Sequence, residues 1–240
     1  MLRVVRDLHR AVARRHPRLD SGGRTVLERV RSLAADRGER RRVFELIYRE
    51  NLWGDDRSRS GPGSTLEDTA AIRAALPPLL QRLGVRSLLD VPCGDFSWMS
   101  HVPLDLEYYG GDIVPELVDE VRRRYDGPRR RFALVDVVRG PLPRVDLVLC
   151  RDCLVHLSFA DARRALRAVR ASGSTYLLTT TFWDRSVNRD IRTGAWRPLD
   201  LTLPPFSFGP PLELIDERCA LERWPDKGLG LWRVADLPAG

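Results

Sequence analysis

The chain has 240 residues, 43% of them hydrophobic, which is enough for one sizeable core with a small appendage. Its 4 cysteines are too few and too scattered for a disulfide scaffold, which favours a reducing cytoplasm. No stretch approaches the roughly 18 apolar residues of a membrane span, and the start lacks the apolar run of a secretory signal. We therefore expect a cytoplasmic protein without a membrane span.

The net charge of +7 is concentrated near the N-terminus, where residues 1–42 hold 13 arginines against 5 acidic residues. A basic arm can follow the phosphates of a nucleic acid. The alternative is an amphipathic helix, because apolar residues recur at helical spacing from Leu2 to Val12 and would leave the arginines on the wet face. We favour the helix and predict a helical N-terminal extension or lid over residues 1–60.

A Gly/Pro/Ser-rich turn opens the second predicted unit, residues 61–240. Ser64 and Glu67 have the spacing of a capping box, which predicts that a helix begins at Thr65. A proline pair, Pro77-Pro78, is expected to break or restart that helix.

From about residue 86, short apolar runs alternate with helical stretches. Near-continuous apolar strands separated by helices indicate a parallel sheet covered on both faces. Right-handed crossovers then give a doubly wound α/β fold. Two apolar stretches around a Pro-Asp-Lys-Gly turn at the end of the chain are typical of a closing antiparallel hairpin. The expected strands are 87–91, 106–113, 131–138, 145–150 and 175–182; the expected helices are 115–125 and 159–170, with Ser158 as the cap of the second.

Carboxylates follow successive predicted strands, at the edge where open parallel sheets bind ligands. Asp90 ends the first strand, Asp112 the second and Asp136 the third. An acid after the second strand is placed to accept both ribose hydroxyls of a nucleotide, and Asp136 suits an exocyclic amine. Gly94 lets the backbone approach a ligand closely. Any one acid could be only a helix cap, but three in phase with the strands predict a nucleoside site.

Over about residues 85–181, these features resemble the class I S-adenosylmethionine-dependent methyltransferases. The resemblance rests on the strand–Asp-x-x-Cys-Gly turn, the acids after the next two strands and DLVLCRDCLVHLS (146–158) after the fourth. The longer pattern DVPCGDFSWM resembles a bacterial subgroup of these enzymes. The family's glycine-rich turn begins acid-x-Gly-x-Gly, whereas this chain has Pro92 and Phe96 at two glycine positions. Proline removes one backbone N–H from that turn.

The resemblance implies a Rossmann-like, mostly parallel seven-stranded sheet and S-adenosylmethionine as the cofactor. Asp90 would approach the amino end of the cofactor, Asp112 its ribose and Asp136 its adenine. The protein would transfer a methyl group to an O or N atom of a small-molecule, sugar or peptide acceptor in bacterial metabolism. The candidate cofactor-binding residues are Asp90, Pro92, Cys93, Gly94, Asp95, Asp112, Ile113, Asp136, Val137, Arg151 and Ser64.

Catalytic and acceptor-binding candidates lie after the fourth and fifth strands. His156 could remove a proton from the acceptor, with Asp152 as the competing base or as an orienting group; a packing role for His156 stays open. Residues 182–211 show no clear period, which predicts a substrate-facing loop. Aromatic and guanidinium groups there suit a planar or anionic acceptor, although a lid fixed by its own contacts would look the same. The candidates are Trp183, Arg185, Asn188, Arg192, Trp196 and Arg197.

Other functions stay open from the sequence alone. An RNA-directed methyltransferase or nucleic-acid-binding protein would use the basic arm, although nucleic acid is the disfavoured partner. A nicotinamide oxidoreductase is disfavoured because G-x-G-x-x-G is missing, and a non-catalytic cofactor-binding relative or a homodimer stays open. We predict no metal site, because Cys150 and Cys153 lack two partner ligands and the pair Asp152 and Asp184 has no defined geometry.

Overall fold

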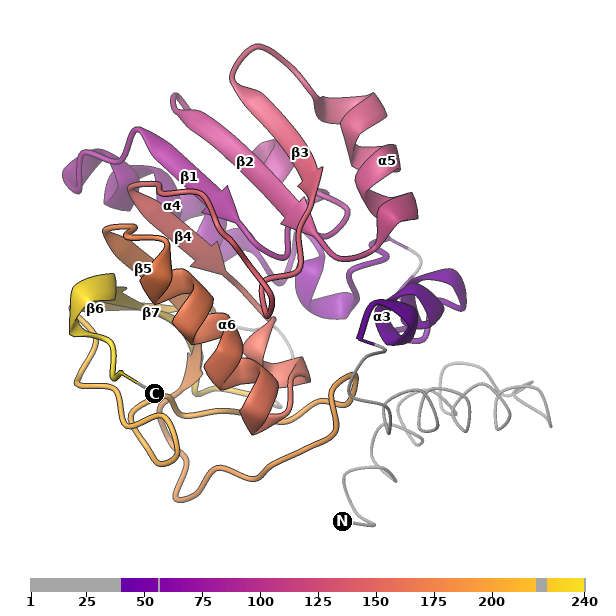
Figure 1. Ribbon diagram of the computed structural model, residues 1–240. Helices are drawn as coiled ribbons and strands as arrows, with labels where there is room; N and C mark the ends of the chain where they lie inside the picture. Colours follow the sequence, from indigo (N-terminus) through magenta and orange to yellow (C-terminus); the bar gives the residue numbers. More distant parts are fainter. Residues whose placement is uncertain (1–39, 56, 219–223, 240) are drawn as a thin grey trace, which may run out of the picture.

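A sheet of seven strands forms the centre of the protein (Figure 1). The computed structural model describes residues 40–55, 57–218 and 224–239. The strands are β1 (Ser87–Asp90), β2 (Glu107–Asp112), β3 (Arg130–Leu134), β4 (Leu147–Cys150), β5 (Tyr176–Phe182), β6 (Glu213–Asp216) and β7 (Lys227–Arg233). Their order is β3-β2-β1-β4-β5-β7-β6. β1 to β5 are parallel, and β7 is antiparallel to both of its neighbours. The predicted doubly wound, mostly parallel fold is confirmed.

Helices cover both faces of this sheet because successive strand residues point to opposite sides. The described helices are α3 (Arg40–Arg49), α4 (Ala70–Arg82), α5 (Pro115–Tyr125) and α6 (Phe159–Ala171). Leu88 and Leu149 pack in the same apolar cluster as the buried face of α4. Their neighbours Leu89 and Val148 pack on the other side, with α6. The strands are therefore buried on both faces, which explains their near-continuous apolar sequences.

The predicted helices between strands are confirmed, including the cap at Ser158, whose hydroxyl accepts from the Asp161 N–H at 3.2 Å. The predicted closing hairpin is also confirmed by β6 and β7. The third strand ends at Leu134, earlier than expected. The reason is local, since the Asp136 carboxylate accepts from the Val138 N–H at 2.9 Å and turns the chain.

Two predictions for the helix after residue 64 are wrong: its start at Thr65 and its break at Pro77-Pro78. The helix begins at Ala70, because residues 62–64 form a separate 3₁₀ turn and the Thr65 hydroxyl accepts from the Asp68 N–H at 3.2 Å. It then continues through Pro77 and Pro78. Proline removes an intrahelical hydrogen bond, but the face of α4 that includes Leu76 and Leu79 is fully buried, so tertiary packing overrides the local cost.

The helix α3 lies against the carboxyl edge of the sheet and next to α5 (Figure 1). The Tyr48 hydroxyl donates to Glu120 at 2.9 Å, and Arg49 pairs with Glu116 at 2.6 Å. At the other end, Arg40 pairs with Asp136 at 3.0 Å. The predicted extension over residues 1–60 falls mostly outside the described residues, so its boundary stays a prediction.

Residues 183–211 contain no helix or strand, and the Leu199 carbonyl oxygen accepts from the Phe182 N–H at the end of β5. Arg197 is buried and donates to the carbonyl oxygens of Leu154 and Leu157, each at 2.7 Å. Asn188 is also buried and donates to the Asp200 carbonyl oxygen at 2.7 Å. Buried side chains therefore fix this segment by satisfying backbone groups that would otherwise be unpaired.

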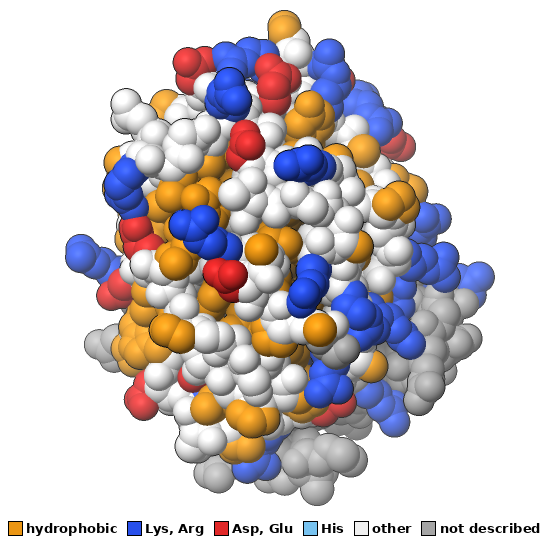
Figure 2. Space-filling model, turned by 60° about the vertical axis from the view of Figure 1, so that its left-hand side comes forward, with side chains coloured by type: hydrophobic (Ala, Val, Ile, Leu, Met, Phe, Trp, Pro, Cys, Tyr) orange, Lys and Arg blue, Asp and Glu red, His pale blue; other side chains and the backbone are white. Residues whose placement is uncertain are grey.

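The surface mixes side chains of both charges. On the face drawn in Figure 2, acidic and apolar side chains lie between the basic ones over most of the view. Within the described ranges, no helix combines the length and the apolar composition that crossing a bilayer requires. The basic residues 1–39 lie outside those ranges.

One close packing contact in the sheet can be tested directly. Gly110 lies opposite Phe132 in the β2–β3 ladder, and a Cβ at Gly110 would lie 2.4 Å from the Phe132 ring. We expect Gly110→Ala to lower the free energy of urea unfolding by about 1–3 kcal/mol through overpacking. Phe132→Leu should relieve the clash. The double variant should therefore lose less unfolding free energy than the two single variants together, by at least about 0.5 kcal/mol.

Gly127→Ala is the matched control, because no atom lies within 4 Å of an added Cβ there. Its unfolding free energy should stay within about 0.5 kcal/mol of wild type. Strict additivity of Gly110→Ala and Phe132→Leu would show that the two positions do not compete for space.

Candidate functional site

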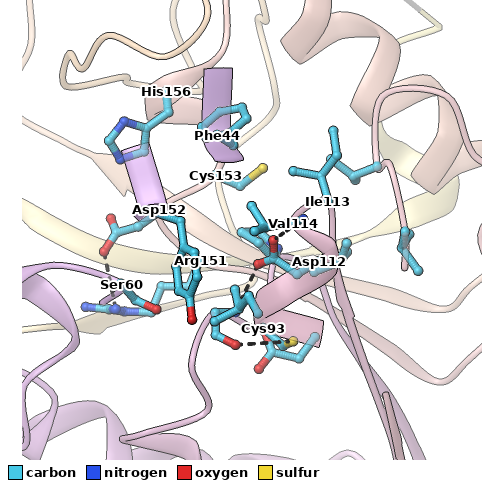
Figure 3. A pocket seen from close by; sticks show the side chains of 18 of the residues that line it. Phe44, Ser60, Cys93, Asp112, Ile113, Val114, Arg151, Asp152, Cys153 and His156 are labelled. Atoms are coloured by element: carbon cyan, nitrogen blue, oxygen red, sulfur yellow. Dashed lines mark hydrogen bonds and ion pairs between the residues drawn. The ribbon is translucent and has the colours of Figure 1, made fainter. Parts of the chain in front are cut away.

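A cavity opens at the carboxyl ends of β1, β2 and β4 (Figure 3) and contains about 1090 Å³ of empty space, its mouth included. Ends of adjacent parallel strands are where such folds bind ligands. Ten of the eleven predicted cofactor-binding residues and both predicted catalytic residues line it. They are Ser64, Asp90, Pro92, Cys93, Gly94, Asp112, Ile113, Asp136, Val137, Arg151, Asp152 and His156.

Asp90 and Asp112 are carboxyl groups buried beside this cavity, 2% and 6% exposed. Burial raises the pKa of Asp90 to about 7, although the Tyr108 hydroxyl donates to it at 2.7 Å and Arg151 also opposes the rise. Burial raises the pKa of Asp112 to about 6 against hydrogen bonds from the Val114 and Gly94 N–H groups, at 3.0 and 3.2 Å. Buried ionised carboxylates are costly unless a partner compensates them, so both positions suit a ligand that donates hydrogen bonds or carries positive charge.

Asp95, the remaining predicted cofactor-binding residue, does not line the cavity. Its carboxylate accepts from the Ser58 hydroxyl at 2.8 Å and the Arg59 N–H at 2.9 Å, and its own N–H donates to the Ser60 hydroxyl at 3.0 Å. Asp95 therefore attaches the 58–60 loop to the turn after β1. The pair of serines flanking Arg59 was the available sequence signal for this contact.

Gly94 is required by this attachment. It has a φ of +55°, a left-handed conformation that favours glycine. A Cβ there would lie 2.2 Å from the Ser60 Oγ. The sequence analysis expected a ligand to approach Gly94 closely, and the 58–60 loop does so in the structure. Ser60 and Gly94 both line the cavity.

The helix α3 supplies a wall that the sequence reasoning did not include. Arg40, Phe44 and Tyr48 line the cavity from α3. Arg40 reaches the Asp136 Oδ2 at 3.0 Å, while the Asp136 Oδ1 accepts from Val138. A ligand amine that approached Asp136 would share this carboxylate with Arg40.

Four charged groups form a connected cluster at one end of the cavity. The Arg151 guanidinium and the Lys227 ammonium both contact Glu217 Oε2, at 2.7 and 3.1 Å. They also both contact Asp152 Oδ2, at 3.2 and 2.7 Å. Arg151 and Asp152 follow β4, whereas Glu217 and Lys227 come from the β6–β7 hairpin. The sequence reasoning missed the hairpin pair, although Lys227 is the only lysine in the chain.

His156 lies beside Asp152 (Figure 3). Its Nδ1 is 2.9 Å from the Ala195 carbonyl oxygen, and a carbonyl can only accept, so Nδ1 carries the proton and Nε2 keeps its lone pair. Burial lowers the pKa of His156 to about 4, although the Ala195 contact and Asp152 raise it. The Trp53 ring packs against the imidazole at a centroid distance of 5.0 Å. At neutral pH this group is a neutral proton acceptor.

The predicted acceptor-binding residues do not line this cavity. Trp196 packs on Trp224 at a centroid distance of 4.6 Å, and Arg185 pairs with Asp226 at 2.6 Å. Asn188 and Arg197 are buried in backbone contacts, whereas Trp183 and Arg192 are exposed. Asp184 is exposed too. The structure brings other groups to the cavity instead, notably Trp53 and Arg59.

No protein-family model and no curated protein sequence matches the chain. Solved structures do match. The 1,6-didemethyltoxoflavin-N1-methyltransferase of Burkholderia thailandensis, with bound 1,6-didemethyltoxoflavin and S-adenosylhomocysteine, is 18% identical with a TM-score of 0.53; the match covers 80% of this chain and 86% of that chain. Magnesium protoporphyrin IX methyltransferase from Synechocystis PCC 6803 with bound SAM is 14% identical with a TM-score of 0.50, over 81% of this chain and 96% of that chain.

The chain spans half the length of a third match, an S-adenosylmethionine-dependent methyltransferase from Clostridium acetobutylicum, with 16% identity, a TM-score of 0.42 and 48% of this chain covered. This match is too partial to add to the assignment. The two longer ones match at TM-scores of 0.53 and 0.50 over most of both chains. The chain therefore has the Rossmann-like fold of class I S-adenosylmethionine-dependent methyltransferases.

Proposed function

We propose that this protein is an S-adenosylmethionine-dependent methyltransferase acting on an O or N atom of a small-molecule, sugar or peptide acceptor. The observation that carries the proposal is the shared cavity of Asp90, Asp112 and Asp136, which follow three adjacent parallel strands. Both of the longer structural matches are methyltransferases, with SAM bound in one and S-adenosylhomocysteine in the other.

The lining residues fit the cofactor by their chemistry. A carboxylate at Asp90 suits the ammonium of the cofactor's methionine part, because that positive charge would compensate the buried negative charge. Asp112 suits the ribose hydroxyls, and Asp136 suits the adenine amine while also paired with Arg40. When bound, the cofactor supplies an electrophilic methyl group on a sulfonium, which leaves a neutral thioether when the methyl group is transferred.

The chain's own contribution is to position the acceptor, exclude water and accept its proton. His156 is suited to the last task, because its Nδ1–H points at the Ala195 carbonyl oxygen and its Nε2 has no hydrogen-bond partner among the described residues. Asp152 favours the protonated imidazole by its charge. The pair can therefore accept a proton as the acceptor atom gains the methyl group.

Calorimetry tests the cofactor assignment. S-adenosylmethionine and S-adenosylhomocysteine should bind, and NAD should not. Asp112→Ala should weaken both affinities at least about tenfold through loss of hydrogen bonds to a charged group. Asp105→Asn is the control, because this side chain is 98% exposed and precedes β2 at the opposite edge of the sheet. Binding of NAD without any response to the other two would overturn the proposal.

The raised pKa values of Asp90 and Asp112 predict a pH dependence. At Asp90 and Asp112 the unbound folded protein should hold more protons than the unfolded chain from about pH 4 to 7, so these two groups lower its stability as pH rises through that window. The lowered pKa of His156 opposes them by one proton between about pH 4 and 6.5 and offsets part of the effect. Cofactor binding should need the ionised Asp90 and thus release protons at pH 6 but not at pH 8. Calorimetry in two buffers of different ionisation enthalpy measures this release; equal heats at pH 6 would contradict it.

His156→Gln tests the proton acceptor. Glutamine keeps a side-chain N–H for the Ala195 carbonyl oxygen but cannot take up a proton, so kcat should fall about 10²- to 10⁴-fold. The affinity for S-adenosylhomocysteine should change less than about threefold, which separates the proton transfer from cofactor binding. An unchanged kcat would show that no base acts at this position.

A further inference from the structure

The one lysine of this chain occupies a buried position behind the candidate acceptor site. Lys227 is the only lysine among 40 basic residues and is 7% exposed. A Cβ on Gly63 would lie 3.7 Å from the Lys227 Nζ and 3.5 Å from the Asp152 Oδ2. The 62–64 turn therefore lies beside both charged groups. A compact ammonium suits this position better than a planar guanidinium.

Lys227 and Arg151 both bind the same oxygen of Asp152, its Oδ2. The other oxygen, Oδ1, has no partner among the residues that the structure describes, and a quarter of the side chain is exposed where it borders the cavity. The backbone at Asp152 has a φ of +50°, which side chains other than glycine rarely adopt. Two cations thus hold one carboxylate oxygen and leave the other open to a ligand.

The charges of the cluster define what that ligand can be. Although burial opposes ionisation, Lys227 and Arg151 hold the pKa of Asp152 well below its usual range. Its ionised Oδ1 can only accept a hydrogen bond and would repel a carboxylate or phosphate. Arg151 and Lys227 both lie within 3.2 Å of the Asp152 carboxylate. These two cations would repel a ligand ammonium that approached Oδ1, so the cluster favours a neutral donor.

The Nε2 of His156 is a second acceptor on the same wall, four residues further along the turn after β4 (Figure 3). Because the two side chains lie beside one another and both line the cavity, they match a ligand with two neighbouring hydroxyl groups. A ligand with a single hydroxyl would satisfy His156 and leave Asp152 Oδ1 desolvated and unpaired, which weakens binding. The indole of Trp53, packed against His156, adds an apolar surface beside these atoms.

From this arrangement we propose that Asp152 Oδ1 binds a second hydroxyl of the acceptor, so that the methylated group is one hydroxyl of a vicinal diol, as in a sugar or a cyclitol. The inference rests on the proposed methyl transfer and narrows its acceptor from any O or N atom to this class. In this arrangement His156 takes the proton of the reacting hydroxyl. Asp152 holds the neighbouring hydroxyl without covalent change, and Lys227 is a positioning residue that acts through Asp152.

A matched set of small acceptors tests the proposal: cis- and trans-1,2-cyclohexanediol, cyclohexanol and cyclohexylamine. With methyl-labelled S-adenosylmethionine, we expect kcat/KM for at least one diol to exceed that for cyclohexanol by about 10- to 100-fold, the range of a hydrogen bond to a charged group. Cyclohexylamine should not be methylated. Saturation-transfer NMR can measure binding of the same four molecules to the protein saturated with S-adenosylhomocysteine. It should show the same preference without turnover.

Asp152→Asn separates recognition from a general loss of activity. The amide keeps the size of the side chain, and asparagine tolerates the left-handed backbone, but its neutral hydrogen bond is about half as strong. The preference of the variant for the diol over cyclohexanol should shrink to a few-fold in both assays, and Lys227→Met should have the same effect. Asp105→Asn, which is remote from the cavity, should keep the wild-type preference. A purely structural role for Asp152 would lower all rates and leave the ratio unchanged.

The outcomes distinguish this inference from the proposed function. Equal use of cyclohexanol and the diols, methylation of cyclohexylamine, or no transfer to either diol despite tight cofactor binding would each overturn the diol subsite. The cofactor assignment would then still stand. Failure of S-adenosylmethionine and S-adenosylhomocysteine to bind in the same preparation would instead overturn the proposed function.

Discussion

Two carboxyl groups buried at the carboxyl ends of neighbouring strands are the constraint on which the rest of this structure depends. Asp90 is 2% exposed and Asp112 is 6% exposed. Burial is the main cause of the raised pKa of each carboxyl group. A fold selected for stability alone would place apolar residues there, because desolvating a carboxylate costs free energy. Their presence in a cavity is explained by a ligand that brings the missing positive charge and hydrogen-bond donors.

The surrounding structure keeps these groups in place and covers them. Parallel pairing of β1 with β2 places the two acids at the same edge of the sheet. The turn between them can carry the loop 58–60 because Gly94 has no side chain and Asp95 binds the loop. The same loop leads into the 62–64 turn, whose Gly63 carbonyl oxygen accepts from Arg151 at 2.7 Å. The segment 58–64 thus connects the turn after β1 to the charged end of the cavity.

The sequence predicted the parts of the site that local pattern determines. Apolar runs identified the strands, and the positions of Asp90, Asp112 and Asp136 followed from where those strands end. The helix start at Thr65 was wrong because Thr65 itself binds the Asp68 N–H, and the break at Pro77-Pro78 was wrong because tertiary packing of α4 outweighs local propensity. Residues 182–211 have a composition that suits ligand binding. Several of their polar side chains, such as Arg197, instead make buried contacts with the protein backbone.

Contacts between distant residues explain what the sequence could not supply. Glu217 and Lys227 reach Arg151 and Asp152 across 66 and 75 positions, so no spacing rule connects them. This divides the cavity in two. One end is built from successive strand ends, whereas the other depends on two residues of the β6–β7 hairpin, Glu217 and Lys227. Likeness to the solved structures bears on the fold, so the proposed acceptor is inferred from charge. Two cations bound to one oxygen of Asp152, beside a neutral imidazole, would favour uncharged hydrogen-bond donors at the other oxygen.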